Sequence, residues 1–167
     1  LREGAKEADV VIICTPLRAY KFIIEQIAPV LKPGSLITDV GSTKVKVMEL
    51  FASLPAGVHA IGGHPMAGAE IQGIAGADRY LFENAVYILT AKSDTPQEMV
   101  RVLENVLAST GARIKHMEAA RHDELVAMVS HIPHMAAVAL VGLTEGRQEE
   151  LMLAAGGFRD TTRIASS

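Results

Sequence analysis

The sequence predicts an α/β protein in which a mostly parallel sheet carries helices on its faces and an all-helical region follows. Over the first two thirds of the chain, short β-branched runs alternate with segments whose apolar residues recur at helical spacing. The first run is apolar throughout, as in a strand that helices cover from both sides. Beyond residue 117 only helical patterns remain. We therefore expect one unit at residues 1–117 and a second at residues 118–167.

Strands and helices are predicted to alternate within the first unit, except that the loop around His64 separates the third predicted strand from the fourth. Strands are expected at residues 9–14, 35–40, 58–61, 85–89 and 112–115. Thr15 is predicted to be the N-cap of the first helix after a strand, with Pro16 at its first helical position. Ser42 is predicted to cap the next helix, and residues 95–98 have the pattern of a capping box.

The helical region begins with a long segment, residues 118–143, that is apolar around most of its circumference. Such a helix is expected to be deeply buried. Pro133 lies inside it and should kink or break it, because proline lacks the backbone N–H that a helix interior needs. A short charged helix is expected after Gly156 and Gly157.

Composition and charge exclude several classes of protein. The chain has 167 residues, 49% of them hydrophobic, which is enough to fill a core. A net charge of −3 without a basic run gives no reason to expect a nucleic-acid partner. The single cysteine, Cys14, cannot form an intrachain disulfide, which fits a reducing, cytoplasmic location. No signal peptide is visible, and no uninterrupted apolar run reaches the roughly 20 residues of a membrane span, so no membrane partner is expected.

The most informative stretch of the chain is residues 62–70, which surround His64 with glycine and alanine. Pro65 should push the backbone of His64 toward an extended conformation. Gly62, Gly63 and Gly68 leave room for close backbone approach and for positive φ. Imidazole gains or loses a proton near neutral pH. This loop is typical of a site that presents one base to a ligand, although a hydrogen-bonded loop histidine is the simpler alternative.

Two further turns should lie beside this loop. Ligands of parallel sheets bind at the carboxyl ends of the strands. Thr15 and Pro16 follow the first predicted strand, and Gly41 and Ser42 follow the second. We therefore expect these residues and His64 to meet at one edge of the sheet.

His131 and His134 are three residues apart and should share one helix face. They belong either to a hydrogen-bonded core network or to a polar ligand cavity. A metal site formed with His64 is a further alternative, since zinc sites use three histidines, but no supporting carboxylate is evident beside them. We expect no metal.

Arg159 and Arg163 are four residues apart and should also share a helix face. Solvated surface arginines are the ordinary outcome of such spacing. Two guanidinium groups behind a double glycine would equally suit a small dicarboxylate.

Five segments, taken in order, resemble the prephenate dehydrogenase family, which includes arogenate and cyclohexadienyl dehydrogenases. They are residues 39–44, 62–70, 81–85, 130–134 and 156–164, and together they extend over nearly the whole chain. The resemblance implies a partial Rossmann-type domain followed by the start of an all-α dimerisation domain, and hence a homodimer. It also implies a cytoplasmic enzyme of tyrosine biosynthesis, with tyrosine as a possible feedback ligand.

The same resemblance implies an NAD(P)-dependent oxidative decarboxylation of prephenate to 4-hydroxyphenylpyruvate, with NAD as the expected cofactor and NADP as the alternative. His64 would be the base at the ring hydroxyl, and Ser42 would hold that hydroxyl close to the nicotinamide. The residues implied at the substrate are His134, Arg163, Arg159, Glu70 and Gly156, with Arg163 on a carboxylate. The residues implied beside the cofactor are Thr15, Pro16, Gly41 and Ser42.

The sequence departs from the family pattern at its start, where a strand, a glycine-rich phosphate turn and a helix are expected. No two glycines in the chain are two residues apart, so the Gly-x-Gly-x-x-Gly fingerprint is absent. These 167 residues alone are therefore expected to bind NAD weakly or not at all. Three alternatives stay open: arogenate as the substrate, another 3-hydroxyacid-type dehydrogenase, and an inactive module that senses an aromatic acid.

Overall fold

The computed structural model of the chain describes residues 1–68 and 73–166. The described chain separates into two compact units, Leu1–Asp123 and Glu124–Ser167. Each unit is described by itself below. The first holds the sheet and the candidate base, and the second is helical.

A five-stranded sheet forms the centre of the first unit. Its strands lie in chain order: β1 (Val10–Ile13), β2 (Leu36–Asp39), β3 (His59–Pro65), β4 (Val86–Ala91) and β5 (Arg113–His116). Every neighbouring pair is parallel except β3 and β4, which run antiparallel. The predicted mostly parallel sheet is confirmed, and the one reversed pair was not predicted. As a result, β1, β2 and β3 end at one edge of the sheet, whereas β4 and β5 end at the other.

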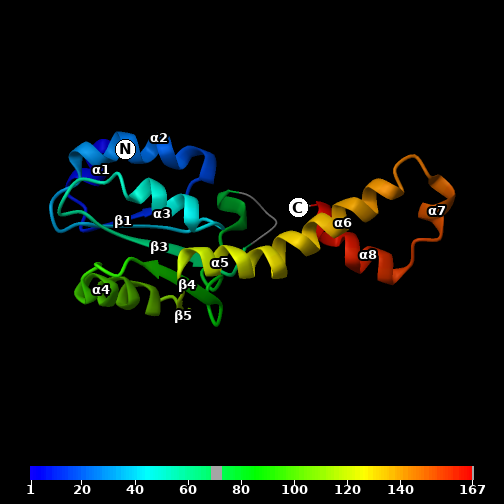
Figure 1. Cartoon of the computed structure of the whole chain (residues 1–167). Helices are drawn as coiled ribbons and strands as arrows, with labels where there is room; N and C mark the ends of the chain where they lie inside the picture. The colour runs from blue at the N-terminus through cyan, green and yellow to red at the C-terminus, as the bar shows by residue number, and fades with distance from the viewer. Residues whose placement is uncertain (69–72, 167) are drawn as a thin grey trace. The chain divides into compact units, whose positions relative to one another are not determined.

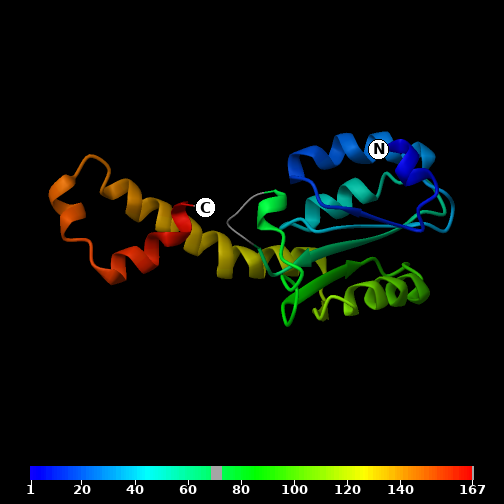
Figure 2. The same ribbon diagram turned by 180° about the vertical axis from the view of Figure 1, so that it is seen from behind.

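Helices cover both faces of this sheet (Figures 1 and 2). Helices α1 (Arg2–Lys6), α2 (Tyr20–Ile27) and α3 (Val45–Phe51) lie on one side, and α4 (Gln97–Ala108) lies on the other. Three-residue 3₁₀ turns at Leu17–Ala19, Ala28–Val30 and Ile74–Gly76 complete the unit. The layered arrangement follows from strands that are apolar on both faces.

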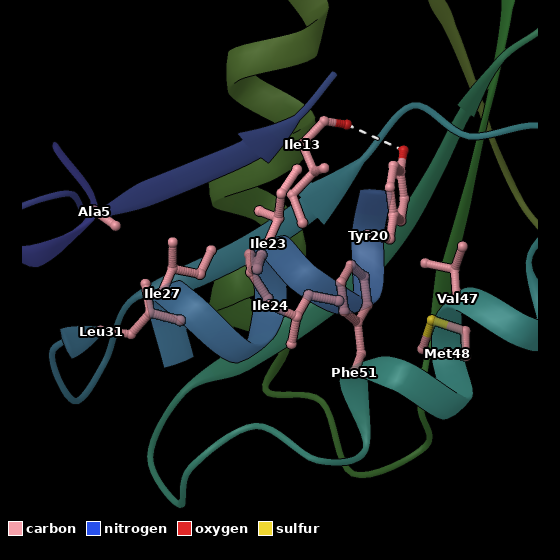
Figure 3. Close-up of a cluster of buried hydrophobic side chains, with 11 residues drawn as sticks. Ala5, Ile13, Tyr20, Ile23, Ile24, Ile27, Leu31, Val47, Met48 and Phe51 are labelled. Carbon is pink, nitrogen blue, oxygen red and sulfur yellow. Dashed lines mark hydrogen bonds between the residues drawn. The ribbon is translucent and has the colours of Figure 1, made fainter. Parts of the chain in front are cut away.

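Each helical layer has its own apolar core. The core on the α2–α3 side contains Tyr20, Ile24 and Ile27 together with Val47 and Phe51 (Figure 3). Their recurrence every three or four residues is the stripe that the sequence shows. A second core, between α4 and the sheet, contains seven fully buried side chains: Leu36, Ile61, Tyr87, Leu89, Val100, Leu103 and Leu107. The two cores fix the sheet rigidly between helices.

The predicted helix caps are wrong in each of the three cases. The 3₁₀ turn before α2 has Pro16 at its N-cap position, and Thr15 lies outside it. Helix α4 begins at Gln97 with Pro96 at its N-cap, while the Thr95 hydroxyl instead accepts a hydrogen bond from the Lys92 N–H at 3.1 Å. Helix α3 begins at Val45, three residues after Ser42. In all three the helix begins later than the capping pattern predicts, at Leu17, Gln97 and Val45, a shift of one or two residues.

A continuous helical segment from Ala119 to Leu143 leads into the second unit. It comprises α5 (Ala119–Val126), a π-helical turn (Ala127–His131) and α6 (Ile132–Leu143). Pro133 does not break this helix, but a π turn interrupts the regular α-helix directly before it. The kink that was the other expected outcome stays a prediction. Pro133 lies in the first turn of α6, where its missing N–H is tolerated, and the wider π turn precedes it.

The remainder of the second unit packs back onto α6. Helix α7 (Gln148–Met152) is followed by α8 (Gly156–Thr162) and a 3₁₀ turn (Arg163–Ser166). Both α8 and this last turn contact α6. The expected short helix after Gly156 is confirmed.

The prediction that the long apolar helix is deeply buried is wrong. Ala137 is the one fully buried residue recorded for α6, and apolar side chains along the segment are strongly exposed. These exposed residues are Met128, Val129, Ile132, Met135, Val138, Val141 and Leu143. By length and composition alone this helix is able to cross a bilayer, although its apolar residues form no uninterrupted run of that length. Burial of an apolar face needs a covering surface, and α8 with the last turn covers only part of α6.

Candidate active site

His64 lies in a strand and not in a loop. It is the penultimate residue of β3 and pairs with Ile88 of β4. The expected extended backbone before Pro65 is confirmed. A strand between two neighbours holds its side chains more firmly than a loop does. The geometry therefore strengthens the interpretation of His64 as a positioned group.

The glycines before His64 serve close packing. A Cβ on Gly63 would lie well inside van der Waals contact with the Asp39 carbonyl oxygen, and one on Gly62 would lie 3.0 Å from the Met48 sulfur. The expected close backbone approach is therefore confirmed at both positions. The expected positive φ is wrong, because none of Gly62, Gly63 and Gly68 has one.

A buried ion pair clamps the backbone next to His64. The Lys44 ammonium donates to Asp39 Oδ2 at 2.5 Å and to the Gly63 carbonyl at 2.6 Å. Asp39 Oδ1 in turn accepts from the Gly63 N–H at 2.9 Å. Both charged side chains are fully buried. The Gly63 N–H is thus held by Asp39 at the end of β2 and the Gly63 carbonyl by Lys44 at the start of α3, which fixes the residue that precedes His64.

Burial lowers the pKa of Lys44, while the neighbouring carboxylate of Asp39 opposes that change. Asp39 Oδ2 also accepts from the Gly41 N–H at 2.8 Å. The carboxylate is therefore bound by two backbone donors and one ammonium group. Such pairs cost free energy to bury, and removal of one partner leaves an uncompensated charge.

The ring of His64 is joined to a second histidine. His64 Nδ1 and His122 Nε2 lie 2.8 Å apart, and the two rings meet edge to face. His122 Nδ1 lies 2.7 Å from Asp123 Oδ1. The His122 side chain is fully buried, whereas that of Asp123 is 27% exposed. A hydrogen-bonded chain therefore runs from a carboxylate through a buried imidazole to the candidate base, all within the first unit.

Asp123 also caps α3, in place of the predicted Ser42. Its two carboxylate oxygens accept the backbone N–H groups of Lys44, at 2.6 Å, and of Val45, at 2.9 Å. Burial raises the pKa of Asp123, but the hydrogen bonds from Val45, His122 and Lys44 outweigh it and hold that pKa below its usual value. Asp123 therefore links the start of α3 to the histidine pair as an ionised group.

The turns expected beside His64 lie at the same edge of the sheet. Thr15 and Pro16 follow β1, and Gly41 and Ser42 follow β2, and the parallel register brings both turns to the end of the sheet where β3 carries His64. Gly41 is buried, while Thr15, Pro16 and Ser42 are exposed. The structure thus confirms the placement of these residues, and their roles stay predictions.

The expected substrate residues, apart from Glu70, lie in the second unit. His134 is half-buried in α6, and Gly156 opens α8. Arg159 lies in α8 and Arg163 in the last turn, both exposed, and both elements pack on the helix that carries His134. Glu70 lies outside the described residues. Their roles at a substrate also stay predictions.

His131 and His134 do not form an equivalent pair. His131 is exposed, in the π turn, whereas His134 is half-buried. Within residues 1–68 and 73–166, no group of three or more histidine, cysteine, aspartate or glutamate side chains is arranged to hold a metal ion. His64 instead uses a ring nitrogen for His122.

Sequence reasoning missed His122, Asp123 and Lys44 as parts of this site. The adjacent His122–Asp123 pair at the start of a helix was the available signal. The two histidines that share a hydrogen bond are 58 residues apart, so no local pattern connects them. Lys44 stands in the same short segment as Ser42, and a lysine there is ordinarily assumed to be solvated.

An α/β sheet with an imidazole held at the carboxyl edge of its parallel strands, followed by a helical unit, is the plan of a nucleotide-binding enzyme with a separate helical domain. Comparison with known proteins identifies the family of the enzyme. The family model for the nucleotide-binding domain of prephenate dehydrogenase matches residues 2–116, and the one for the dimerization domain of the same enzyme matches residues 118–167. The chain belongs to the prephenate dehydrogenase family.

Curated relatives agree with this assignment. The chain is 44% identical to the prephenate dehydrogenase of Bacillus subtilis over 98% of its own length, and 42% identical to that of Lactococcus lactis over 100%. These matches span 46% and 47% of the two relatives, so the chain covers about half the length of the curated proteins it matches.

Solved structures of the family superimpose on the whole chain. The Synechocystis arogenate dehydrogenase covers 100% of it with a TM-score of 0.86 and 36% identity, and the match spans 62% of that protein. A prephenate dehydrogenase from A. aeolicus, in complex with hydroxyphenyl propionate and NAD+, covers 95% with a TM-score of 0.85 and 32% identity, over 57% of its length. A 3-hydroxyisobutyrate dehydrogenase of Mycobacterium tuberculosis, at 18% identity and a TM-score of 0.59, shares the fold alone.

Proposed function

We propose that the full-length protein catalyses the oxidative decarboxylation of prephenate to 4-hydroxyphenylpyruvate with NAD as its cofactor. The observation that carries the proposal is the rigidly held imidazole of His64 at the edge where three parallel strands meet. Membership of the prephenate dehydrogenase family supports the choice of substrate.

His64 is the base in this proposal. The ring hydroxyl of prephenate transfers its proton to an imidazole nitrogen as the hydride leaves the same carbon and the carbon–oxygen bond becomes a carbonyl. Loss of carbon dioxide then makes the ring aromatic as a phenolate, which takes the proton back from His64 to become the phenol. Proton transfer of this kind suits an imidazole whose pKa lies near the working pH. Ser42, exposed at the end of β2, would orient the hydroxyl.

NAD, when bound, supplies the acceptor for the hydride that leaves the ring carbon. The residues present fit its nicotinamide end: the hydroxyls of Thr15 and Ser42 are exposed at the edge of the sheet where ligands of such folds bind. Pro16 and Gly41 shape the same two turns. The relative from A. aeolicus that contains NAD+ supports this choice of cofactor.

Residues of the second unit would bind the substrate. Prephenate carries two carboxylates, and a guanidinium group binds a carboxylate through two parallel hydrogen bonds. Arg163 would hold one carboxylate, and His134 with Arg159 and Gly156 would line the pocket. Glu70 would lie near the mouth of that pocket.

We also propose that the protein is a cytoplasmic homodimer that contacts neither membrane nor nucleic acid. The apolar side chains exposed along α6 require a cover, and the dimerization-domain match spans this helix. A partner subunit is therefore the cover that the family match supports, in preference to lipid.

Substitution of the base tests the catalytic assignment. In the full-length protein, His64→Asn should lower kcat by about 10²-fold or more while the KM for prephenate changes little, because asparagine cannot accept the proton. His59→Asn, at the opposite end of the same strand, is the matched control and should keep wild-type kcat. Wild-type turnover in the His64 variant, measured as NADH formation, would refute the assignment.

Arogenate is the second candidate substrate, because the Synechocystis structure that matches the chain is an arogenate dehydrogenase. The two substrates differ in a keto group and an amino group. Values of kcat/KM measured with each, with and without tyrosine, decide between them. Inhibition by tyrosine would also establish it as the feedback ligand.

A further inference from the structure

We infer that Asp123 and His122 form a positioning pair that keeps the base nitrogen of His64 unprotonated and directed to the ligand. This inference rests on the proposed role of His64 and adds two residues to it. Neither residue touches the reacting atoms in this account. They act through the ring of His64.

The first step of the argument concerns the proton on His122. A carboxylate accepts hydrogen bonds and cannot donate one. Asp123 Oδ1 lies 2.7 Å from His122 Nδ1, so that nitrogen must carry the proton and donate it. The Asp123 carboxylate is itself held by the N–H groups of Lys44 and Val45, which keeps it in place and ionised.

The second step deduces the tautomer of His64 from that of His122. In a neutral imidazole only one nitrogen carries a proton. His122 Nε2 is therefore an acceptor, and His64 Nδ1, 2.8 Å away, must donate to it. The basic nitrogen of His64 is then Nε2, the atom on the opposite side of the ring from His122.

The alternative arrangement puts a second proton on His122. That proton would reverse the hydrogen bond, so that His64 accepts at Nδ1 and carries its own proton on Nε2. It would also place a positive charge on a ring with no exposed surface. A buried charge is costly even beside a carboxylate. The neutral chain is therefore the arrangement that the geometry supports.

Catalysis gains in two ways from this chain. The correct tautomer is present before the substrate arrives, so no proton has to be relocated. When His64 accepts a proton at Nε2, its Nδ1–H bond to His122 becomes charge-assisted and shorter. In Ser-His-Asp triads, the loss of the correct histidine tautomer alone lowers kcat by about 10⁴-fold.

Histidine nitrogen NMR tests the tautomers without any substrate. The full-length protein, labelled with ¹⁵N-histidine, should show His64 protonated at Nδ1 and His122 protonated at Nδ1 at neutral pH. A coupling across the hydrogen bond should connect His64 Nδ1 with His122 Nε2. A resting His64 protonated at Nε2 would overturn the inference.

A shape-matched variant tests the consequence for catalysis. His122→Phe keeps a ring in the buried position but accepts no hydrogen bond. We expect kcat to fall about 10- to 100-fold, as for partners that orient metal-bound imidazoles, with the KM for substrate changed less than about twofold. His116→Phe is the matched control: His116 makes a histidine–carboxylate hydrogen bond of 2.7 Å with Glu104, away from His64, and its loss should leave kcat unchanged.

The outcomes separate this inference from the proposed function. Wild-type protein that turns over neither prephenate nor arogenate would refute the function, while the NMR tautomers would still test the chain. A His122→Phe variant that folds and keeps wild-type kcat would refute the positioning role, while the function would stand. If His122→Phe does not fold, the NMR tautomers of the wild-type protein alone decide whether the positioning inference holds.

Discussion

At the scale of single residues, the site depends on a glycine, which has no side chain, and on charged side chains that are buried. Gly63 has no Cβ because the β2 backbone occupies that space. Its N–H is bound by Asp39 of β2 and its carbonyl by Lys44 at the start of α3. Lys44 and Asp39 are charged yet fully buried, each satisfied by the other and by backbone groups. Contacts among these three residues fix the backbone next to His64 and therefore its position. The sequence identifies the candidate base, while its environment comes from residues distant in the chain.

Gly63→Ala should displace β2 from β3 at the site. The added methyl group overlaps the Asp39 carbonyl, which is backbone and cannot move away cheaply. We expect a loss of about 1–3 kcal/mol in the free energy of unfolding, measured by urea denaturation of the full-length protein. Gly68→Ala is the control, because no atom of the described residues lies within 4 Å of its added Cβ. Equal stability of the two variants would contradict this account of Gly63.

At the scale of elements, the start of α3 shows why caps are difficult to predict. Ser42 has a side chain that commonly caps helices, but α3 begins three residues after it, at Val45. The first N–H groups of α3 are instead bound by the carboxylate of Asp123, which is 78 residues from Val45 in the chain. A single element, α5, thereby supplies both the cap of α3 and the partner of His64. Helix start and site geometry are coupled through Asp123.

Asp123→Asn should destabilise the protein at neutral pH and progressively less in acid. The folded-state pKa of Asp123 is depressed, so its contribution is complete above the unfolded pKa of about 3.9 and is lost as pH falls through the folded value. We expect a difference of about 1 kcal/mol in the free energy of unfolding near neutral pH, because asparagine keeps one acceptor oxygen but loses the charge that strengthens the bonds from Lys44, Val45 and His122.

Denaturant midpoints of wild type and variant, measured from neutral pH down to about pH 2, check this expectation. The two curves should converge in the acidic range. Asp78→Asn, which removes an exposed carboxylate from a local turn, serves as the control. A difference that stays constant down to the lowest pH would contradict the assigned role.

At the scale of the whole molecule, the chain covers about half the length of the curated relatives it matches and consists of two units with different features. The first unit places the candidate base, and the second exposes an apolar helix. Each feature follows from a family in which one domain binds nucleotide and the other forms the dimer.

Met135→Glu should weaken the proposed dimer. Met135 is 70% exposed on α6, and a carboxylate there would be buried without a partner in a dimer interface. We expect the full-length variant to shift toward monomer in light scattering at micromolar concentration. Phe22→Glu, at a comparably exposed position on α2, should leave the wild-type mass unchanged. A Met135→Glu variant that stays fully dimeric would place the interface elsewhere.

These 167 residues alone should bind NAD weakly or not at all, since the chain lacks the glycine-rich turn that binds pyrophosphate. Isothermal calorimetry measures this directly, with the full-length protein as the positive control. Low-micromolar affinity in the isolated chain would show that its own residues suffice for the cofactor.

The sequence by itself determined the α/β plan, the order of the elements, the candidate base and the family resemblance, because these depend on local periodicity and short motifs. Only the tertiary structure decided that His64 stands in a strand, that β3 and β4 run antiparallel, and that Asp123 caps α3 and orients His122. The physical reason is that most of the hydrogen bonds around His64 join residues between 19 and 79 positions apart, which leave no periodic trace in the sequence. The exposed face of α6 is the converse case, because its apolar pattern is visible in the sequence but residues 1–68 and 73–166 leave that face exposed.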